Sequence, residues 1–455
     1  MELILLMTTA PPPYSPWGLS GRLPPLGLSF VASSLEKADF QVQILDNYNI
    51  RKPIEEVKKE VGRLEPEIVG ITCGSVTYRP CIETAKAVKE VLPSCKIVVG
   101  GWQPTYMPES LLQHKEIDYL VMGEGERAMV ELANSITKGE PESDVAKIAG
   151  VAFRHNGKTV MTSPRFIEDV DQIPFPARHL LSMDIYDRAA PYFDSKPMDT
   201  MNVVRGCPHN CAYCETKKLW GSRVRAFSPS RVVAEIKDLA QNFGTRGVYF
   251  VGDNFTINKK RTAQLCRLMK KENLDVEWVC DSRVDRVSRE LLKEMKDAGC
   301  RTIWFGVESG SPRILEKLNK KVTMEQVTRA FRLCKEEGIR IACSFMLGLP
   351  GETIGDMEAT FKFARKLDPD WCQFNAYVAV PGSALYNEVM ENKLYDRVED
   401  FVTYVKTDEF DYETVVKIQK RFHSNFNKSP KRILRKIRQE GVLSVLAKGF
   451  RQLKT

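Results

Sequence analysis

Three cysteines within eight residues, Cys207, Cys211 and Cys214, are the side chains of this sequence best suited to hold a metal centre. Thiolates are soft ligands, and the spacing C-x3-C-x2-C lets all three converge from a single loop. Clusters of the [4Fe–4S] type usually take four cysteines. No fourth follows at a matching interval, so one iron would stay open for a substrate. Two alternatives stay open: a structural zinc site with His209 as fourth ligand, and three unrelated buried thiols.

The elements that must position this loop form a repeated strand-and-helix pattern between residues 200 and 395. The expected strands are Met201–Val204, Gly247–Val251, Val276–Cys280, Thr302–Val307, Ile341–Met346 and Gln373–Val378. The helices between them are Ser230–Asn242, Arg261–Lys271, Ser288–Ala298, Met324–Glu336 and Ile354–Lys366. Six such units predict a partial (β/α)6 barrel of the TIM type, whose chemistry lies at the carboxyl ends of the strands. The cysteine loop follows the first strand.

Residues 1–150 show a similar alternation with shorter apolar strands. The expected strands are Leu3–Thr8, Val42–Asp46, Ile68–Thr72, Ile97–Gly100 and Tyr119–Met122, with helices at Leu26–Lys37, Ile54–Leu64, Ile82–Leu92 and Arg127–Ile136. Continuous apolar strands between helices predict a Rossmann-like, doubly wound parallel sheet covered on both faces. Ligands bind such sheets at the carboxyl ends of the strands. Glycines gather there, at Gly74, Gly100-Gly101 and Gly123-Glu124-Gly125.

The order of these motifs resembles that of the radical SAM (S-adenosylmethionine) enzymes with an N-terminal cobalamin-binding domain. This group includes class B methylases and the anaerobic magnesium-protoporphyrin ester cyclases. The resemblance lies in the cysteine loop, in Pro24–Leu28, in Gly100-Gly101-x-x-Pro104-Thr105-x-x-Pro108-Glu109, and in residues 118–126. It implies a [4Fe–4S] cluster on Cys207, Cys211 and Cys214, together with SAM and cobalamin as further cofactors.

The same resemblance assigns SAM contacts to Tyr213, Gly252, Asp253, Asn254, Arg283, Glu308 and Gly348. Tyr213 would lie by the adenine, Asp253 would bind the amino group and Arg283 the carboxylate. Glu308 would accept hydrogen bonds from the ribose, and the Gly348 loop would pass under the adenine, where a side chain would clash. The alternative for Arg283 and Glu308 is an ion pair with each other across the barrel mouth.

Cobalamin contacts are implied for Asp46, Ser75, Gly100, Gly101, Thr105, Gly123 and Glu124. One departure concerns the cobalt ligand. Related cobalamin domains carry Asp-x-His-x-x-Gly, whereas residues 46–51 keep only Asp46. We therefore expect cobalamin to bind without a protein histidine. The alternative is a Rossmann-like domain that has lost its cofactor.

The activity that the resemblance implies is radical chemistry on an unactivated carbon, and methylation is the leading hypothesis. A reduced cluster would cleave SAM to a 5′-deoxyadenosyl radical, and methylcobalamin would supply the methyl group. No protein side chain in the sequence is a comparably strong candidate for a general acid or base. The alternatives are a non-methylating cyclase or lipid-modifying enzyme, and a non-catalytic cobalamin- or zinc-binding protein. The expected partners are a small-molecule or lipid substrate and an electron donor such as flavodoxin or ferredoxin.

The remaining segments are a connector and a basic tail. Residues 151–199 are rich in proline and aspartate and predict a linker, which opens with a hairpin around Asn156-Gly157. Residues 396–455 predict a helical extension. Lys428–Thr455 carries nine basic residues and one acid, a surplus of eight that equals the net charge of the whole chain. This amphipathic tail suits an anionic membrane surface, or alternatively packs as a solvated helix on the body.

The bulk composition narrows the class of protein. Outside the basic tail the charges of the chain balance, which disfavours binding to nucleic acid. Twelve scattered cysteines form no disulfide framework, and no apolar window approaches about 18 residues, the length of a membrane span. We expect a cytoplasmic enzyme, with contact at the inner membrane surface if the tail binds lipid.

Overall fold

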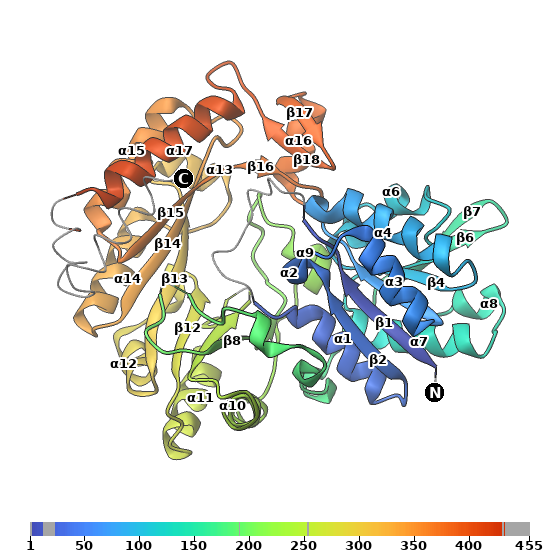
Figure 1. The fold of residues 1–455 in the computed structure, drawn as a ribbon. Helices are drawn as coiled ribbons and strands as arrows, with labels where there is room; N and C mark the ends of the chain where they lie inside the picture. Colours follow the sequence, from blue (N-terminus) through green and yellow to red (C-terminus); the bar gives the residue numbers. More distant parts are fainter. Residues whose placement is uncertain (1, 12–22, 191, 253, 430–431, 433–455) are drawn as a thin grey trace.

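Two sheets with parallel strands at their centres dominate the fold. The structure is a computed structural model, and it describes residues 2–11, 23–190, 192–252, 254–429 and 432. The two α/β bodies lie side by side, with the first at the blue end of the colour scale and the second from green to orange (Figure 1). This arrangement confirms the predicted fold class, a Rossmann-like sheet followed by a partial barrel.

The first sheet has the strand order β2-β1-β3-β4-β5-β6-β7. Its strands are β1 (Leu3–Thr8), β2 (Gln41–Asp46), β3 (Ile68–Thr72), β4 (Lys96–Gly100), β5 (Tyr119–Val121), β6 (Val151–His155) and β7 (Lys158–Met161). The first five run parallel, and the β6–β7 hairpin joins antiparallel to β5 through the pair Val121 and Val151. The hairpin expected at the start of the connector therefore extends the first sheet.

Helices cover both faces of this sheet. The helices α1 (Leu26–Glu36) and α7 (Gly125–Thr137) contact each other on one face, and α3 (Ile54–Leu64) and α4 (Tyr78–Val91) on the other. Strand β1 shows why a continuous apolar run is needed. Successive side chains of a strand point to opposite faces, so Ile4 and Leu6 lie in the core with α1 and α7, whereas Leu5 and Met7 lie in the core with α3 and α4. Shorter helices are α2 (Asn47–Ile50), α5 (Trp102–Tyr106), α6 (Pro108–Leu112) and α8 (Glu142–Val145).

The second sheet is a six-stranded partial barrel with the order β15-β14-β13-β12-β11-β8, all parallel. Its strands are β8 (Met198–Asn202), β11 (Gly247–Val251), β12 (Glu277–Ser282), β13 (Cys300–Glu308), β14 (Arg340–Leu347) and β15 (Trp371–Ala376). The outer helices are α10 (Pro229–Phe243), α11 (Lys259–Lys271), α12 (Arg289–Asp297), α13 (Pro312–Lys317), α14 (Met324–Glu336) and α15 (Ile354–Leu367). Because β8 and β15 do not pair, the barrel stays open.

Smaller elements complete the described part of the chain. Strands β9 (Val204–Arg205) and β10 (Arg225–Ala226) pair around α9 (Thr216–Trp220). Strands β16 (Val378–Ala379), β17 (Tyr395–Glu399) and β18 (Val402–Val405) form a small antiparallel sheet beside α16 (Ala384–Glu391). Single 3-10 turns are η1 (Ser75–Thr77), η2 (Val170–Gln172), η3 (Arg178–Leu180), η4 (Met183–Ile185) and η5 (Val284–Arg286).

The C-terminal extension is only partly helical. It begins with β17 and β18, and the helix α17 (Tyr412–Asn427) then packs along β15 (Figure 1). Most of the basic tail, residues 430–431 and 433–455, lies outside the described residues, and so does its predicted membrane contact. Among the helices of the described ranges, none combines the length and the apolar character of a membrane span.

Candidate active site

The cysteine loop lies where the sequence predicts it, beyond the first barrel strand. It is held by Gly206, whose φ of +87° and close approach to Arg223 exclude a side chain, because a Cβ would lie 2.2 Å from the Arg223 carbonyl oxygen. The Cys207 amide donates to the Gly221 carbonyl at 3.2 Å, and the Cys214 amide donates to the Cys211 carbonyl at 3.1 Å.

The three loop cysteines differ from the other nine in exposure. Cys207, Cys211 and Cys214 are half-buried, whereas all the others are buried. Accessible thiols at the strand ends fit a metal centre that must meet a substrate, and the buried ones behave as core side chains. In the described ranges, no three His, Cys, Asp or Glu side chains are arranged to hold a metal ion.

A turn that follows α13 fastens the cysteine loop to the barrel. The Ala212 amide donates to the Leu318 carbonyl at 2.9 Å, and the Asn319 side-chain amide donates to the Asn210 carbonyl at 2.8 Å. The next residue, Lys320, reaches the Tyr213 hydroxyl at 3.0 Å. These contacts bring the loop against the end of β13.

Lys320 also forms a buried ion pair with Glu308, one of the predicted SAM contacts. Its Nζ lies 2.7 Å from Glu308 Oε1, and the Tyr213 hydroxyl donates to the same oxygen at 2.9 Å. The charges therefore compensate each other away from water. Burial, and next the Glu308 carboxylate, raise the pKa of Tyr213, so its hydroxyl stays a donor. A Cβ on Gly306 would lie 2.3 Å from Glu308 Oε1, and the glycine thus leaves room for the pair.

Arg283 is oriented by different partners from those expected. Its Nε donates to Asp285 Oδ1 at 2.9 Å, its Nη2 donates to the Lys320 carbonyl at 2.7 Å, and its Nη1 lies 3.9 Å from Cys211 Sγ. The alternative ion pair between Arg283 and Glu308 is not the observed one, because Lys320 occupies that place. Arg283, Glu308 and Tyr213 are nevertheless brought together around Lys320, a residue that the sequence analysis missed.

The other predicted SAM residues lie at two further strand ends. Gly252 follows β11 with a φ of +145°, and a Cβ there would lie 3.1 Å from the Val204 carbonyl oxygen. Asn254 is buried, and its Nδ2 has no hydrogen-bond partner among the described residues. A buried donor without a partner fits a site that a polar ligand completes. Asp253 lies outside the described residues.

Gly348 has no room for a side chain within the protein itself. Its φ is +81°, and a Cβ would lie 2.8 Å from the side chain of Val415 on α17. Its amide donates to Glu352 Oε2 at 2.7 Å, and the Leu349 amide donates to the same oxygen at 3.0 Å. Glu352 thus shapes this loop. Burial raises the pKa of its carboxyl to about 7, although the two amides oppose the shift.

The first domain contains a cavity of about 200 Å³ at the carboxyl ends of its strands. Four predicted cobalamin residues line it: Gly100, Gly101, Gly123 and Glu124. Residues that the sequence analysis did not assign also line it, among them Gly27 on α1, Gly70 on β3, Trp102, Leu219 and Trp220. The indole of Trp102 is 56% exposed, so a flat aromatic side chain lies open at the cavity wall.

The remaining three predicted cobalamin residues make contacts within the protein. Asp46 is buried and accepts hydrogen bonds from Thr8 at 2.6 Å, Asn49 at 2.7 Å and Tyr186 at 2.8 Å. Thr105 joins two of the glycine-bearing loops, because its hydroxyl donates to the Gly101 carbonyl and accepts from the Gly123 amide. The Ser75 hydroxyl lies 3.2 Å from Gln103 Oε1. These residues hold the strand ends in place.

Comparison with solved structures shows that the fold is shared with known enzymes. The fold matches the cobalamin-dependent S-adenosylmethionine radical enzyme OxsB with a TM-score of 0.78, 17% identity and coverage of 96% of this chain and 68% of that one. It matches the radical S-adenosylmethionine methyltransferase TsrM from Kitasatospora setae with a TM-score of 0.70, 20% identity and coverage of 86% and 75%. The chain therefore shares the two-domain fold of these two structures.

Sequence comparison gives the family. Residues 201–364 match the radical SAM superfamily, and residues 19–133 match the B12 binding domain. An uncharacterized methyltransferase of Pyrococcus horikoshii is 34% identical over 91% of this chain and 90% of its own. The anaerobic magnesium-protoporphyrin IX monomethyl ester cyclase of Rubrivivax gelatinosus is 31% identical over 84% and 68%. The chain belongs to the radical SAM superfamily, in the group that carries a B12 binding domain.

Family membership implies the three predicted cofactors, a [4Fe–4S] cluster, SAM and cobalamin. It favours the iron–sulfur interpretation of the cysteine loop over the zinc alternative. The fit of the chain to these groups rests on three observations: the accessible thiols, the buried Asn254 donor without a partner, and the glycine-lined cavity.

The substitution Glu352→Gln is expected to change how stability depends on pH. The ordinary carboxyl pKa of 4.5 is raised to about 7 by burial. Protonation therefore favours the folded state below pH 4.5, and this contribution is lost as pH rises through 7. The free energy of unfolding of the wild type, minus that of the variant, should fall by about 3 kcal/mol between pH 4 and pH 8. Denaturant titrations measure it, and a constant difference would contradict the buried carboxyl.

Proposed function

We propose that this protein is a cobalamin-dependent radical SAM methyltransferase that acts on an unactivated carbon. One observation carries the proposal. The segment that bears the three cysteines continues directly into α9, and Leu219 and Trp220 at the end of α9 line the cavity of the first domain. The chain thus holds the candidate cluster loop and the candidate cobalamin cavity against each other, as a reaction that needs both cofactors requires.

The barrel residues have distinct roles in this proposal. Cys207, Cys211 and Cys214 hold the cluster, and Tyr213 and Glu308 contact the adenosine. Arg283 and Lys320 are two cations beside the loop, and they suit the SAM carboxylate. Asp253, next to Gly252 in the sequence, suits the amino group, and the side-chain amide of Asn254, a donor, suits an acceptor oxygen of SAM. Gly348 keeps its loop close to the nucleoside. When bound, these cofactors supply an electron that cleaves SAM and a methyl group carried by cobalamin.

The cavity of the first domain suits the cobalamin nucleotide by its walls. Glycines on α1, β3 and α7 leave space between helices and sheet, and the lining is mainly apolar. Binding without a histidine ligand to cobalt stays a prediction from residues 46–51. Gly100, Gly101, Gly123 and Glu124 border this space, whereas Asp46, Ser75 and Thr105 support the loops around it.

The second candidate function is a radical reaction without methyl transfer. The similarity to the cyclase of Rubrivivax gelatinosus, at 31% identity, favours it as the alternative, while the relative named a methyltransferase, at 34%, favours the first. Both need an external electron donor such as flavodoxin or ferredoxin, and a small-molecule or lipid substrate.

Contact of the basic tail with an anionic membrane surface remains a proposal that rests on its sequence, and liposome binding by a chain truncated after Asn427 tests it.

Product analysis of anaerobically reconstituted enzyme tests the function. Reduced wild type incubated with SAM and candidate substrates should release 5′-deoxyadenosine, and S-adenosylhomocysteine should appear alongside it if methylation occurs. Cys211→Ala should lose the brown colour and most of the bound iron, with no nucleoside product, because the cluster loses one of its three thiolate ligands. Cys266→Ala, in the buried core, serves as the control and should keep the brown colour and the bound iron. Wild type that binds iron but never cleaves SAM would sink the proposal.

The substitution Gly27→Leu tests the cavity. A Cβ on Gly27 has no neighbour within 4 Å, so a larger side chain fills the cavity without disturbing the fold. Because Gly is a poor helix former, the variant should be as stable as the wild type or more stable by up to about 1 kcal/mol. We expect it to lose cobalamin, measured by absorbance after gel filtration and by quenching of tryptophan fluorescence. Gly355→Leu, at the same position of α15, is the matched control and should bind normally.

A further inference from the structure

Four buried charged side chains join the two domains beside the cysteine loop. Arg205 Nη1 donates to Glu124 Oε1 at 2.9 Å, and Arg205 Nη2 donates to Glu126 Oε1 at 2.5 Å. Arg225 Nη1 lies 2.8 and 2.7 Å from the two Glu124 oxygens. None of these side chains is more than 7% exposed. We call Arg205, Arg225, Glu124 and Glu126 the domain latch.

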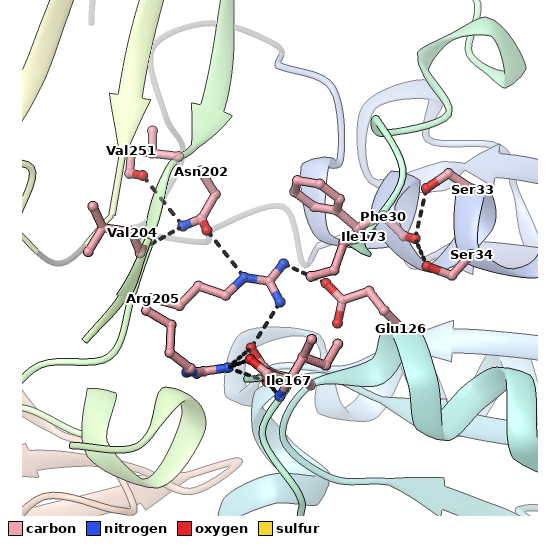
Figure 2. Close-up of polar contacts among 12 residues, drawn as sticks. Phe30, Ser33, Ser34, Glu126, Ile167, Ile173, Asn202, Val204, Arg205 and Val251 are labelled. Atoms are coloured by element: carbon pink, nitrogen blue, oxygen red, sulfur yellow. Dashed lines mark hydrogen bonds and ion pairs between the residues drawn. The ribbon is translucent and has the colours of Figure 1, made fainter. Parts of the chain in front are cut away.

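The domain latch is electrically neutral and enclosed by aromatic rings. Two arginines face two glutamates, so no charge is left uncompensated. The guanidinium of Arg205 lies 4.7 Å from the ring centre of Trp220 and 5.3 Å from that of Phe30, and Arg225 lies 5.1 Å from the ring of Phe166. Figure 2 shows the Arg205 side chain extending between the Asn202 side of the barrel and Glu126 of the first domain.

The two ends of the latch border the two cofactor sites. Arg205 is two residues before Cys207 and ends β9, and Gly206, with its φ of +87°, stands between them. Glu124 and Glu126 line the cavity of the first domain, at the start of α7. Trp220 belongs to both, because it lines the cavity and packs on the Arg205 guanidinium. Arg205 is therefore adjacent to the cysteine loop along the chain and in contact with residues of the cavity wall.

The planar geometry of the arginine lets the domain latch define the orientation of the two carboxylates. A guanidinium is planar and presents its donors in a fixed fork, so one side chain can bind two carboxylates and fix their orientation. Glu124 and Glu126 are two residues apart, and the fork of Arg205 spans both. A lysine keeps the charge but offers a point donor on a flexible stem. It therefore binds the same carboxylates without defining the angle between the domains.

We propose that Arg205 is a positioning residue that sets the separation between the cluster and cobalamin. This inference rests on the proposed function, since it needs both groups in place. A purely stabilising role is the competing explanation, because many buried ion pairs only hold a fold together. The pair Arg178–Glu235 provides a comparison: it is equally buried, with exposures of 2% and 5%, and it touches neither the cysteine loop nor the cavity lining.

The experiment compares Arg205→Lys with Arg178→Lys in full-length, reconstituted protein. Cobalt, iron and thermal stability are measured first. The spin–spin interaction between reduced cluster and cob(II)alamin is then measured by electron paramagnetic resonance, which depends steeply on their separation. We expect both variants to retain both cofactors, and only Arg205→Lys to change the dipolar broadening. If Arg205→Lys does not fold, Glu126→Gln replaces it, since that change removes one negative charge of the domain latch and keeps Arg205.

Two outcomes would overturn the proposal. The broadening in the Arg205 variant could equal that of the wild type, or Arg178→Lys could change it to the same extent. A failure of the proposed function looks different, because wild type itself would then lack bound cobalamin or a cluster.

Discussion

A guanidinium buried away from water must be paired, and in this chain the pairing partner of Arg205 belongs to another domain. Removing one member of such a network leaves an uncompensated charge, which costs about 3 to 5 kcal/mol. The cost is what makes the contact specific: Glu124 and Glu126 can satisfy Arg205 only when the cobalamin-binding domain and the barrel meet in one orientation. The aromatic rings around the guanidinium exclude water, so no solvent molecule can replace a missing carboxylate.

In the predicted SAM site, too, the buried charges are paired within the protein. Lys320 neutralises Glu308, and its backbone carbonyl orients Arg283, so the charged groups are held before any ligand arrives. Preorganised charges need little rearrangement when a zwitterionic ligand binds. The turn that contains Lys320 also holds the cysteine loop through Leu318 and Asn319. One short segment thereby links the metal-binding loop to the nucleoside site.

Sequence patterns located most strands and helices of the two α/β bodies, but they missed the small sheet at the start of the C-terminal extension and the long-range pairings. Strands Leu3–Thr8, Ile68–Thr72 and Gly247–Val251 and helix Met324–Glu336 lie where apolar periodicity predicted them. Periodicity is a local property of the sequence, so it identifies single strands and helices. Because the carboxyl ends of parallel strands lie at one edge of a sheet, the edge that carries the site follows from the strands. The β6–β7 hairpin was placed in the connector because an Asn-Gly turn shows two paired strands but not the sheet that they join.

The same distinction applies to the site residues: local spacing reveals some of them, and long-range contacts place the others. Cys207, Cys211 and Cys214 are recognisable because their spacing is itself the signal. Lys320 was missed because it stands next to Lys321 in what looks like a solvated run, and its burial depends on the fold. The pairing of Glu124 with Arg205 spans 81 residues, and no periodicity reports it. Gly348 was predicted to approach the adenine, and within the protein a side chain there would also meet Val415, which comes from the C-terminal helix.

The position of β9 and α9 has a consequence for the modular character of the chain. Although each α/β body has its own sheet and core, Arg205, Arg225 and Trp220 belong by sequence to the barrel and find their partners in the first body. A barrel expressed alone would expose two orphaned cations and a large indole at its mouth. The two halves are thus interdependent, and exchanging one of them for the equivalent half of a relative would require the acidic pair and its arginines to travel together.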